Sequence, residues 1–231
     1  MSKMIAAGLA VTVILTLAVP AFSDQVAERT ARLERALRSV RSLQADFDQY
    51  YYSVTVSAPL HEKGRFSFQK PDLMRWEYID PEPKVFLYKD EVFSQYYPED
   101  NQLIRSGLSK AQYESEILTL LSGQKRLKDD YLVEQDIATP AARAAGRLKL
   151  TPRVEGEYAW ITLDPDPRTG LIARAVFQDW AENRTEFIFS KIKENAALKP
   201  SVFALTVPPD CDIIDETSPL LKKRVRLESI P

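Results

Sequence analysis

The chain contains 231 residues, with 31 Lys and Arg against 33 Asp and Glu, and has a formal net charge of -2 at pH 7. This balance argues against a nucleic-acid-binding protein, because such proteins gather positive charge against the phosphate backbone. Cys211 is the only cysteine, so an intrachain disulfide is excluded and packing must hold the fold together. We interpret Cys211 as a small buried apolar side chain rather than a nucleophile.

The N-terminal residues have the pattern of a secretory signal peptide. Lys3 precedes an apolar run over residues 4–20, and the Ala-Phe-Ser sequence of residues 21–23 places small residues where signal peptidase prefers them. The run is shorter than the roughly 20 apolar residues that span a bilayer, which argues against an uncleaved anchor. We therefore expect residues 1–23 to be removed and residues 24–231 to form a single soluble domain.

The chain from Asp24 onward is predicted to form an amphipathic helix. Its apolar stripe recurs at spacings of four and three, with charged residues between: Val26, Thr30, Leu33, Leu37 and Val40. One face of this helix should therefore pack against the rest of the domain.

Two later regions alternate between apolar and polar residues with the period of two that is typical of β-strands. In the first region the predicted strands cover residues 43–57, 63–70, 73–78, 84–88 and 92–97. In the second region they cover residues 131–135, 146–152, 158–164, 171–180 and 185–192. Turn residues bound each segment, so we expect consecutive antiparallel strands in a sandwich or barrel sheet.

A second amphipathic helix is predicted between the two regions, over residues 108–123. Ser109 is a suitable N-cap and Gly123 a suitable end. The broad apolar face of this helix has two interpretations. It could cover the core face of the sheet, or it could be a movable lid over a cavity.

Aromatic residues are concentrated on the predicted strands; the chain has 3 Trp, 10 Tyr and 10 Phe. Phe66 and Phe68 share one face of their strand, and Met74, Trp76 and Tyr78 share one face of the next. A single sheet with so large an apolar face must curl on itself. Curling produces either a filled core or a cavity lined by rings, and composition does not decide between the two.

Catalytic motifs are missing from the sequence. His61 is the only histidine, and no acid or nucleophile lies close to it in a catalytic pattern. The chain has no H-E-x-x-H, C-x-x-C or G-x-S-x-G motif. We therefore expect no enzyme activity, no metal site and no cofactor.

Five segments of the chain form a recognisable combination: SLQADFDQ (42–49), FSFQKPDLMRWEY (66–78), ILTLLSG (117–123), ENRTEFIFSKIKEN (182–195) and FALTVPPDCDII (203–214). Together they resemble the LolA-type family, the periplasmic carriers of the outer-membrane lipoprotein-sorting pathway. The chain departs from the family pattern at Lys70, where an arginine is usual, and at Glu91 and Phe93, where a Gly and a Trp are common.

The resemblance implies a mainly β fold with helices, in which a curled, incompletely closed antiparallel β-barrel encloses a hydrophobic cavity under the N-terminal helix and a short lid helix. On this basis the expected cavity lining consists of Phe47, Phe66, Phe68, Met74, Trp76, Tyr78 and Phe86. The expected lid residues are Tyr113, Ile117, Leu118 and Leu121. Lys70 is the expected latch between the strand and the lid, although an ammonium group cannot reproduce the planar fork of an arginine.

The resemblance also implies a function. The protein would be a periplasmic chaperone that binds the acyl chains of lipoproteins released from the inner membrane and delivers them to the outer membrane. Its donor would be the inner-membrane lipoprotein-releasing ABC transporter, its acceptor an outer-membrane lipoprotein or the membrane itself, and it would act as a monomer. Two alternatives stay open: a periplasmic lipid- or glycolipid-binding sensor or transfer protein of the same fold and, less favoured, a lipid-cleaving enzyme.

Overall fold

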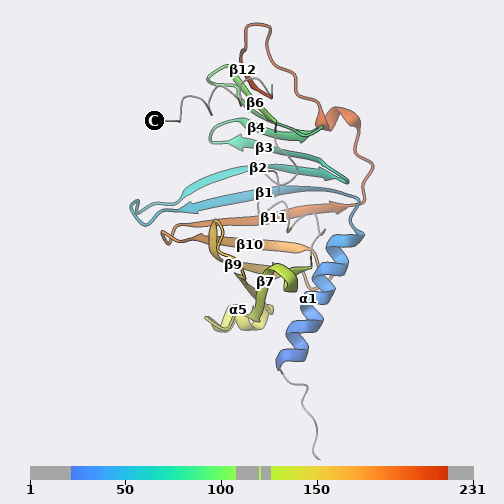
Figure 1. The fold of residues 1–231 in the computed structure, drawn as a ribbon, viewed down its shortest axis with the longest axis vertical. Coiled ribbons are helices and arrows are strands. Elements are labelled where there is room, and N and C mark those ends of the chain that lie inside the picture. Colours follow the sequence, from blue (N-terminus) through green and yellow to red (C-terminus); the bar gives the residue numbers. More distant parts are fainter. Residues whose placement is uncertain (1–21, 108–119, 121–125, 218–231) are drawn as a thin grey trace, which may run out of the picture.

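The computed structural model describes residues 22–107, 120 and 126–217 (Figure 1). The helices with described bounds are α1 (Phe22–Ser39), α4 (Leu127–Asp130), α5 (Pro140–Ala145) and the 3-10 helix η1 (Pro200–Phe203). The strands are β1 (Ser42–Tyr52), β2 (Leu60–Gln69), β3 (Leu73–Asp80), β4 (Lys84–Lys89), β5 (Val92–Tyr97), β6 (Gln102–Gly107), β7 (Tyr131–Gln135), β8 (Leu148–Pro152), β9 (Tyr158–Pro165), β10 (Ile172–Asp179), β11 (Arg184–Glu194) and β12 (Asp212–Glu216). None of the helices in this part of the chain is long and apolar enough to cross a bilayer.

All twelve strands form one sheet, in the order β12-β6-β5-β4-β3-β2-β1-β11-β10-β9-β8-β7. Strands β1 and β11 join the two regions of alternating sequence at the centre of the sheet, and each neighbouring pair is antiparallel except β12 with β6, which is parallel. Because β12 and β7 lie at the two ends of this order, the sheet is not closed into a barrel. This confirms the predicted incompletely closed sheet, with one parallel pair added at its edge.

One hydrophobic core joins α1 to both halves of the sheet. Leu33 of α1, Trp76 of β3 and Leu148 of β8 belong to the same cluster of buried side chains. Strands β3 and β8 stand far apart in the strand order, so a shared core requires the sheet to curl around it. Helix α1 packs on this core, as the sequence predicts, and runs beside the half of the sheet from β11 to β7 (Figure 1).

Helix α1 buries the stripe that its sequence spacing predicts. Leu33, Leu37 and Val40 are at most 4% exposed, and Thr30 is buried with its hydroxyl donating to the carbonyl oxygen of Val26 at 2.7 Å. That bond satisfies a polar group which would otherwise be costly to bury. The core therefore buries the stripe from Thr30 onward, including its one polar member, whereas Val26 is half-buried at the edge of the core.

Strand register brings the predicted ring residues to a single face of the sheet. Phe66 of β2 stands opposite Trp76 of β3, which in turn stands opposite Phe86 of β4. Residues directly opposite each other in a sheet point to the same side. The two alternating sets that the sequence shows on separate strands therefore form one concave surface.

The outer face of β4 to β6 has a small core of its own, which the segment after η1 covers. Arg75 fixes this segment by donating from Nη1 to the carbonyl oxygen of Ala204 at 3.0 Å. The cluster consists of Val85, Tyr96 and Leu103, with Leu205, Val207 and Cys211 packed against them. Half-buried Cys211 thus lies in an apolar contact.

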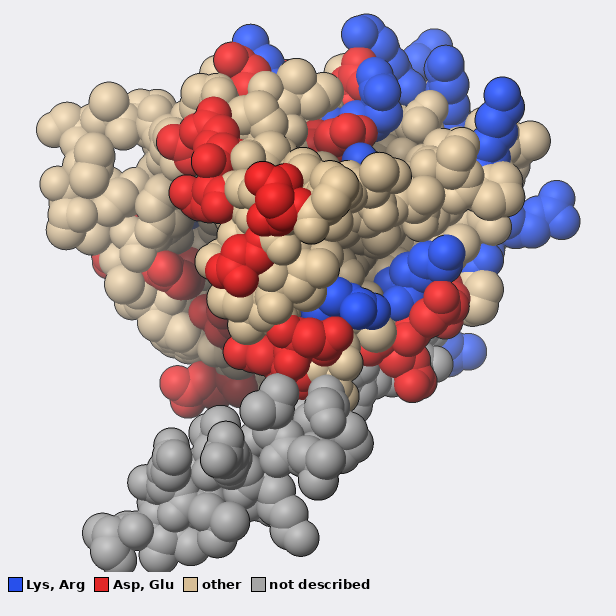
Figure 2. Space-filling view, turned by 90° about the horizontal axis from the view of Figure 1, so that it is seen from above, with Lys and Arg blue, Asp and Glu red and all other residues tan. Residues whose placement is uncertain are grey.

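Charges are mixed on the surface at the end of the sheet that carries β12. Acidic side chains gather on one side of this view and basic side chains on the other (Figure 2). This face therefore does not present the continuous basic surface that a nucleic acid requires.

Candidate functional site

The concave face of the sheet is built around a cluster of buried rings. The ring of Phe47 lies with its centroid 5.0 Å from that of Trp76 and 5.1 Å from that of Tyr78, both in edge-to-face geometry. Phe66 also packs on Trp76, with 4.4 Å between the ring centroids. Such contacts add to the free energy of area burial, so this part of the face is a packed core.

The ring cluster continues from the core onto β4 and β5, where it becomes partly accessible. Phe86 contacts Tyr78 at 5.6 Å between centroids, and it contacts Phe93 and Tyr97 at 6.1 Å each. Phe86, Phe93 and Tyr97 are half-buried, whereas Tyr78 is buried. The concave face therefore offers a continuous apolar surface with a buried centre and a half-buried flank.

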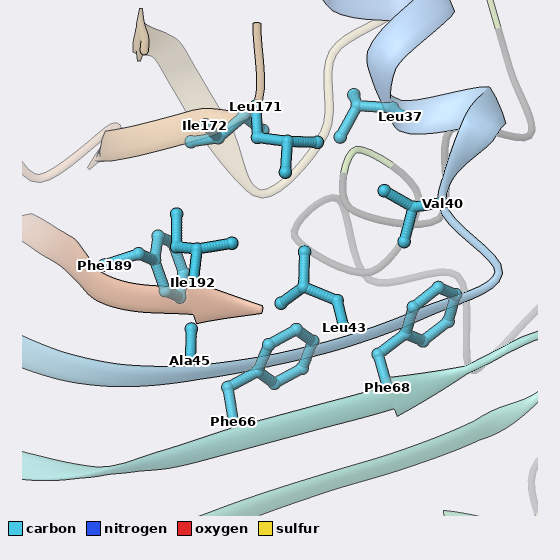
Figure 3. A pocket seen from close by; sticks show the side chains of 10 residues that line it. All are labelled: Leu37, Val40, Leu43, Ala45, Phe66, Phe68, Leu171, Ile172, Phe189 and Ile192. Atoms are coloured by element: carbon cyan, nitrogen blue, oxygen red, sulfur yellow. The ribbon is translucent and has the colours of Figure 1, made fainter. Parts of the chain in front are cut away.

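A small apolar cavity lies where the end of α1 meets the sheet (Figure 3). Its volume is about 20 Å³, and its walls are Leu37, Val40, Leu43, Ala45, Phe66, Phe68, Leu171, Ile172, Phe189 and Ile192. A cavity needs about 10–15 Å³ to hold one water molecule, so this one is far too small for a lipid chain. The part of the concave face below the end of α1 is therefore almost completely filled by its own side chains.

The seven predicted lining residues are assembled on the concave face, where their burial differs. Only Phe66 and Phe68 border the small cavity. Phe47, Met74, Trp76 and Tyr78 are buried in the filled core, and Phe86 is half-buried beside it. Their role in binding a ligand stays a prediction.

A buried polar group interrupts the apolar face beside Tyr78. Glu62 is 5% exposed, pairs with the amine of Lys84, and accepts a hydrogen bond from Gln49 Nε2 at 3.0 Å. The Tyr78 hydroxyl donates to Gln49 Oε1 at 2.7 Å, and burial together with the charge of Glu62 raises the pKa of Tyr78. The motif reasoning missed this network, although the alternation of β2 places Glu62 on the face of Phe66.

Lys70 joins the end of β2 to the end of α1. Its amine donates to the carbonyl oxygen of Leu37 at 3.1 Å and to that of Arg38 at 3.2 Å, and its N–H donates to the carbonyl oxygen of Arg41 at 2.8 Å. The last carbonyl groups of a helix lack partners within the helix, and a cation there is favourable. Burial lowers the pKa of this amine.

The predicted lid residues Tyr113, Ile117, Leu118 and Leu121 lie outside the described residues. Leu120, from the same segment, is described and is buried in the main core. A contact of Lys70 with the lid therefore stays a prediction, whereas its contacts with α1 are observed.

His61 has an acidic neighbour that sequence proximity did not reveal. Its Nε2 lies 2.8 Å from Oδ1 of Asp48 on the neighbouring strand, and its ring stacks on Tyr50 at 4.2 Å. Asp48 and Tyr50 alternate with Phe47 along β1, so the pair lies on the face away from the rings. Within the described ranges, no three His, Cys, Asp or Glu side chains are grouped to hold a metal ion.

The curled open sheet, the amphipathic helix packed on its core and the ring-built concave face define a β-sheet protein with an apolar inner surface. The chain belongs to the family described as "Outer membrane lipoprotein carrier protein LolA", whose model matches residues 38–206. This confirms the resemblance read from the sequence. Membership of a carrier family also confirms that the chain is not an enzyme.

Two proteins named outer-membrane lipoprotein carrier protein are similar along nearly their whole length. The one from Methylococcus capsulatus is 27% identical over 215 residues, covering 88% of this chain and 96% of the relative. The one from Dechloromonas aromatica is 26% identical over 200 residues, covering 80% and 86%. The crystal structure of an uncharacterized conserved protein from Thermus thermophilus shares the fold, with a TM-score of 0.51, 17% identity and coverage of 82% of this chain and 98% of that one.

Proposed function

We propose that the protein carries acylated lipoproteins through the periplasm from the inner to the outer membrane, holding their acyl chains against the concave ring face. The observation that supports this most strongly is the continuity of the ring surface, which runs from buried Trp76 to half-buried Phe93. Membership of a family named for lipoprotein carriage supports the choice of cargo.

The physical need for such a surface follows from the cargo. Each methylene group exposed to water costs about 0.8 kcal/mol, so a lipoprotein with several acyl chains cannot cross an aqueous compartment unaided. Rings on a concave face would shield those chains without covalent attachment. The binding must also be weak enough to release them to an acceptor.

The cavity beside the end of α1 measures about 20 Å³ and has no room for an acyl chain, so binding there would require a conformational change. Helix α1 is fixed at two places that such a change would affect. Lys70 binds its last turn, and Glu34 Oε1 accepts a buried hydrogen bond from the N–H of Leu127 at 2.8 Å. We propose that acyl chains enter by displacing part of this cover, and that the segment containing Ile117 and Leu118 acts as a lid.

The proposed pathway has a donor and an acceptor. The inner-membrane lipoprotein-releasing ABC transporter would supply the energy for extraction, and an outer-membrane acceptor lipoprotein or the membrane would receive the cargo. The protein would act as a monomer, after removal of residues 1–23. The N-terminal sequence of the protein purified from the periplasm should then begin at Asp24, whereas a full-length product in the membrane fraction would contradict this processing.

A transfer assay tests the proposal. The mature protein is incubated with ATP and vesicles that contain the transporter and a labelled lipoprotein, and the soluble complex is then added to acceptor membranes. We expect wild type to release and deliver the lipoprotein, and Phe86→Ala to deliver less. His61→Ala, on the opposite face, is the matched control and should act as wild type. Mass spectrometry that finds only free lipid in the complex would favour the lipid-transfer alternative.

A further inference from the structure

Strand β7 ends the sheet with an edge that no described strand covers. It pairs with β8 alone, and it is the last strand of the sheet order. An edge strand presents a row of N–H and C=O groups to which another chain can add. In Figure 1 this edge lies beside α1 and α5.

Two hydrogen bonds show which groups of β7 point away from β8. The N–H of Arg153 donates to the carbonyl oxygen of Asp130 at 2.8 Å, and the N–H of Asp136 donates to that of Arg147 at 2.9 Å. Because backbone groups alternate in direction along an antiparallel strand, even-numbered residues face β8 here. The N–H and C=O groups of Val133 and Gln135 are therefore directed to the free edge.

A groove of about 620 Å³ runs along this edge, between β7 and the N-terminal half of α1. Every residue of β7 lines it, and Val26, Ala27 and Thr30 form the facing wall. Ligand sites in proteins occupy about 300–1,000 Å³. The groove is thus of binding size, whereas the cavity in the core is not.

The groove combines apolar walls with a positive rim. Val26, Val133 and Ile137 contribute apolar surface, and the side chain of Ile137 is 61% exposed. Lys128, Arg143 and Arg153 also line the groove, against the single carboxylate of Glu134. An occupant with apolar and acidic groups would complement this surface.

One buried atom in the groove wall lacks a hydrogen-bond donor. Gln135 donates from Nε2 to the carbonyl oxygen of Arg143 at 3.2 Å, but its Oε1 is buried without a partner. Leaving a buried acceptor unpaired is costly, and an incoming N–H group would satisfy it.

We propose that this groove binds an extended, acidic segment of a partner polypeptide, which adds to β7 as a further strand. A polypeptide fits better than a lipid, because only a peptide backbone alternates donors and acceptors in register with Val133 and Gln135. A second copy of β7 fits poorly, since the basic rims of the two copies would repel each other. Acidic side chains of the partner would pair with Lys128 and Arg143.

The test uses two fluorescent heptapeptides, one of alternating Glu and Val and one of alternating Lys and Val, together with a fluorescent fatty acid. Anisotropy measures their binding to the mature protein, and amide NMR shifts locate it. We expect the Glu peptide to bind more tightly than the Lys peptide and to shift the amides of Val133 and Gln135. Two variants, Val133→Pro and Arg143→Glu, should each weaken binding of the Glu peptide by about fivefold to tenfold.

Val133→Pro removes an N–H from the free side of an edge strand, where proline is tolerated. Lys193→Glu, an exposed charge reversal on β11, is the control for Arg143→Glu and should bind as wild type. If a variant does not fold, the amide NMR shifts of Val133 and Gln135 in the wild-type protein on adding the Glu peptide still test the proposal. The proposal is overturned if neither peptide binds, if both bind equally, if only the fatty acid shifts the β7 amides, or if the protein dimerises through this edge.

Discussion

The amine of Lys70 and the carbonyl oxygen of Leu37 lie 3.1 Å apart, which joins the end of β2 to the last turn of α1. A second hydrogen bond from the same amine to the carbonyl oxygen of Arg38 strengthens the connection. These bonds fix the end of α1 beside the small apolar cavity, which Leu37 and Val40 help to line.

Replacing this amine should loosen the cover. We expect Lys70→Leu to lower the free energy of unfolding by about 1–2 kcal/mol, because the partly exposed end of the helix loses two charge-assisted bonds. In the transfer assay the variant should retain cargo longer and deliver it more slowly, since its open form is favoured. Lys193→Leu, at an exposed site, is the control. Delivery by Lys70→Leu as fast as by wild type would contradict the latch role.

The carboxylate of Glu34 connects α1 to α4 through the N–H of Leu127, and this bond is buried. We expect Glu34→Ala to lower the free energy of unfolding by about 1–3 kcal/mol, because the buried N–H loses its acceptor. Glu34→Gln keeps an acceptor oxygen and should lose less. Urea unfolding measures both, and hydrogen exchange of the Leu127 amide should accelerate in the alanine variant. Equal stability of the two variants would show that the bond contributes little.

Gly64 provides the space for the ring of Phe47. A Cβ atom at Gly64 would stand 2.1 Å from the carbonyl oxygen of Glu77 and 2.7 Å from the Phe47 ring. Gly64→Ala should therefore destabilise the protein by more than about 3 kcal/mol. Gly107→Ala is the matched control, because its nearest contact would be an ordinary 3.5 Å. Thermal unfolding distinguishes the two, and similar melting temperatures would refute the close contact.

Asp166 should contribute a pH-dependent part of the stability. Its Oδ1 accepts hydrogen bonds from the N–H of Arg168 at 2.7 Å and from the N–H of Thr169 at 2.9 Å. These bonds hold the pKa of Asp166 below the ordinary 3.8, and the bond from Thr169 has the larger effect. A carboxyl group whose pKa is lower in the folded state stabilises the fold at pH values above its pKa in the unfolded state. This contribution is lost as the pH falls through the pKa of the folded state. From about pH 6 to about pH 2, the unfolding free energy of Asp166→Asn should fall less than that of wild type. An unchanged pH slope in this variant would contradict the contribution, and Glu99→Gln is the control.

Much of the fold could be predicted from the sequence, because periodicity is a local property. The stripe from Val26 to Val40 predicted α1, and alternation predicted ten of the strands close to their observed bounds. Strands β6 and β12 were missed, since their short sequences QLIRSG and DIIDE alternate weakly. Helix α5 was also missed, although Thr139 at its N-cap, Pro140 after it and Gly146 at its end with a φ of +67° are recognisable signals.

The candidate site was less predictable, because it depends on which strands become neighbours. Alternation placed Phe66 and Trp76 each on one face of a strand, but only the register shows that the two rings meet. The pairing of His61 with Asp48 and of Glu62 with Lys84 joins residues of different strands in the same way. Whether rings fill a core or line a cavity is decided by side-chain packing, on which the sequence pattern carries no information.

The central claim is that acyl chains of a lipoprotein bind the concave ring face, and photo-crosslinking tests it most directly. A benzoylphenylalanine in place of Phe93 reports on the half-buried flank of that face, and one in place of Tyr50 reports on the opposite face. After loading with a triacylated lipoprotein and irradiation, mass spectrometry identifies the crosslinked atoms. We predict a crosslink to an acyl chain from position 93 and none from position 50. Crosslinking from position 50 alone, or from neither position when the protein is loaded, would contradict the claim.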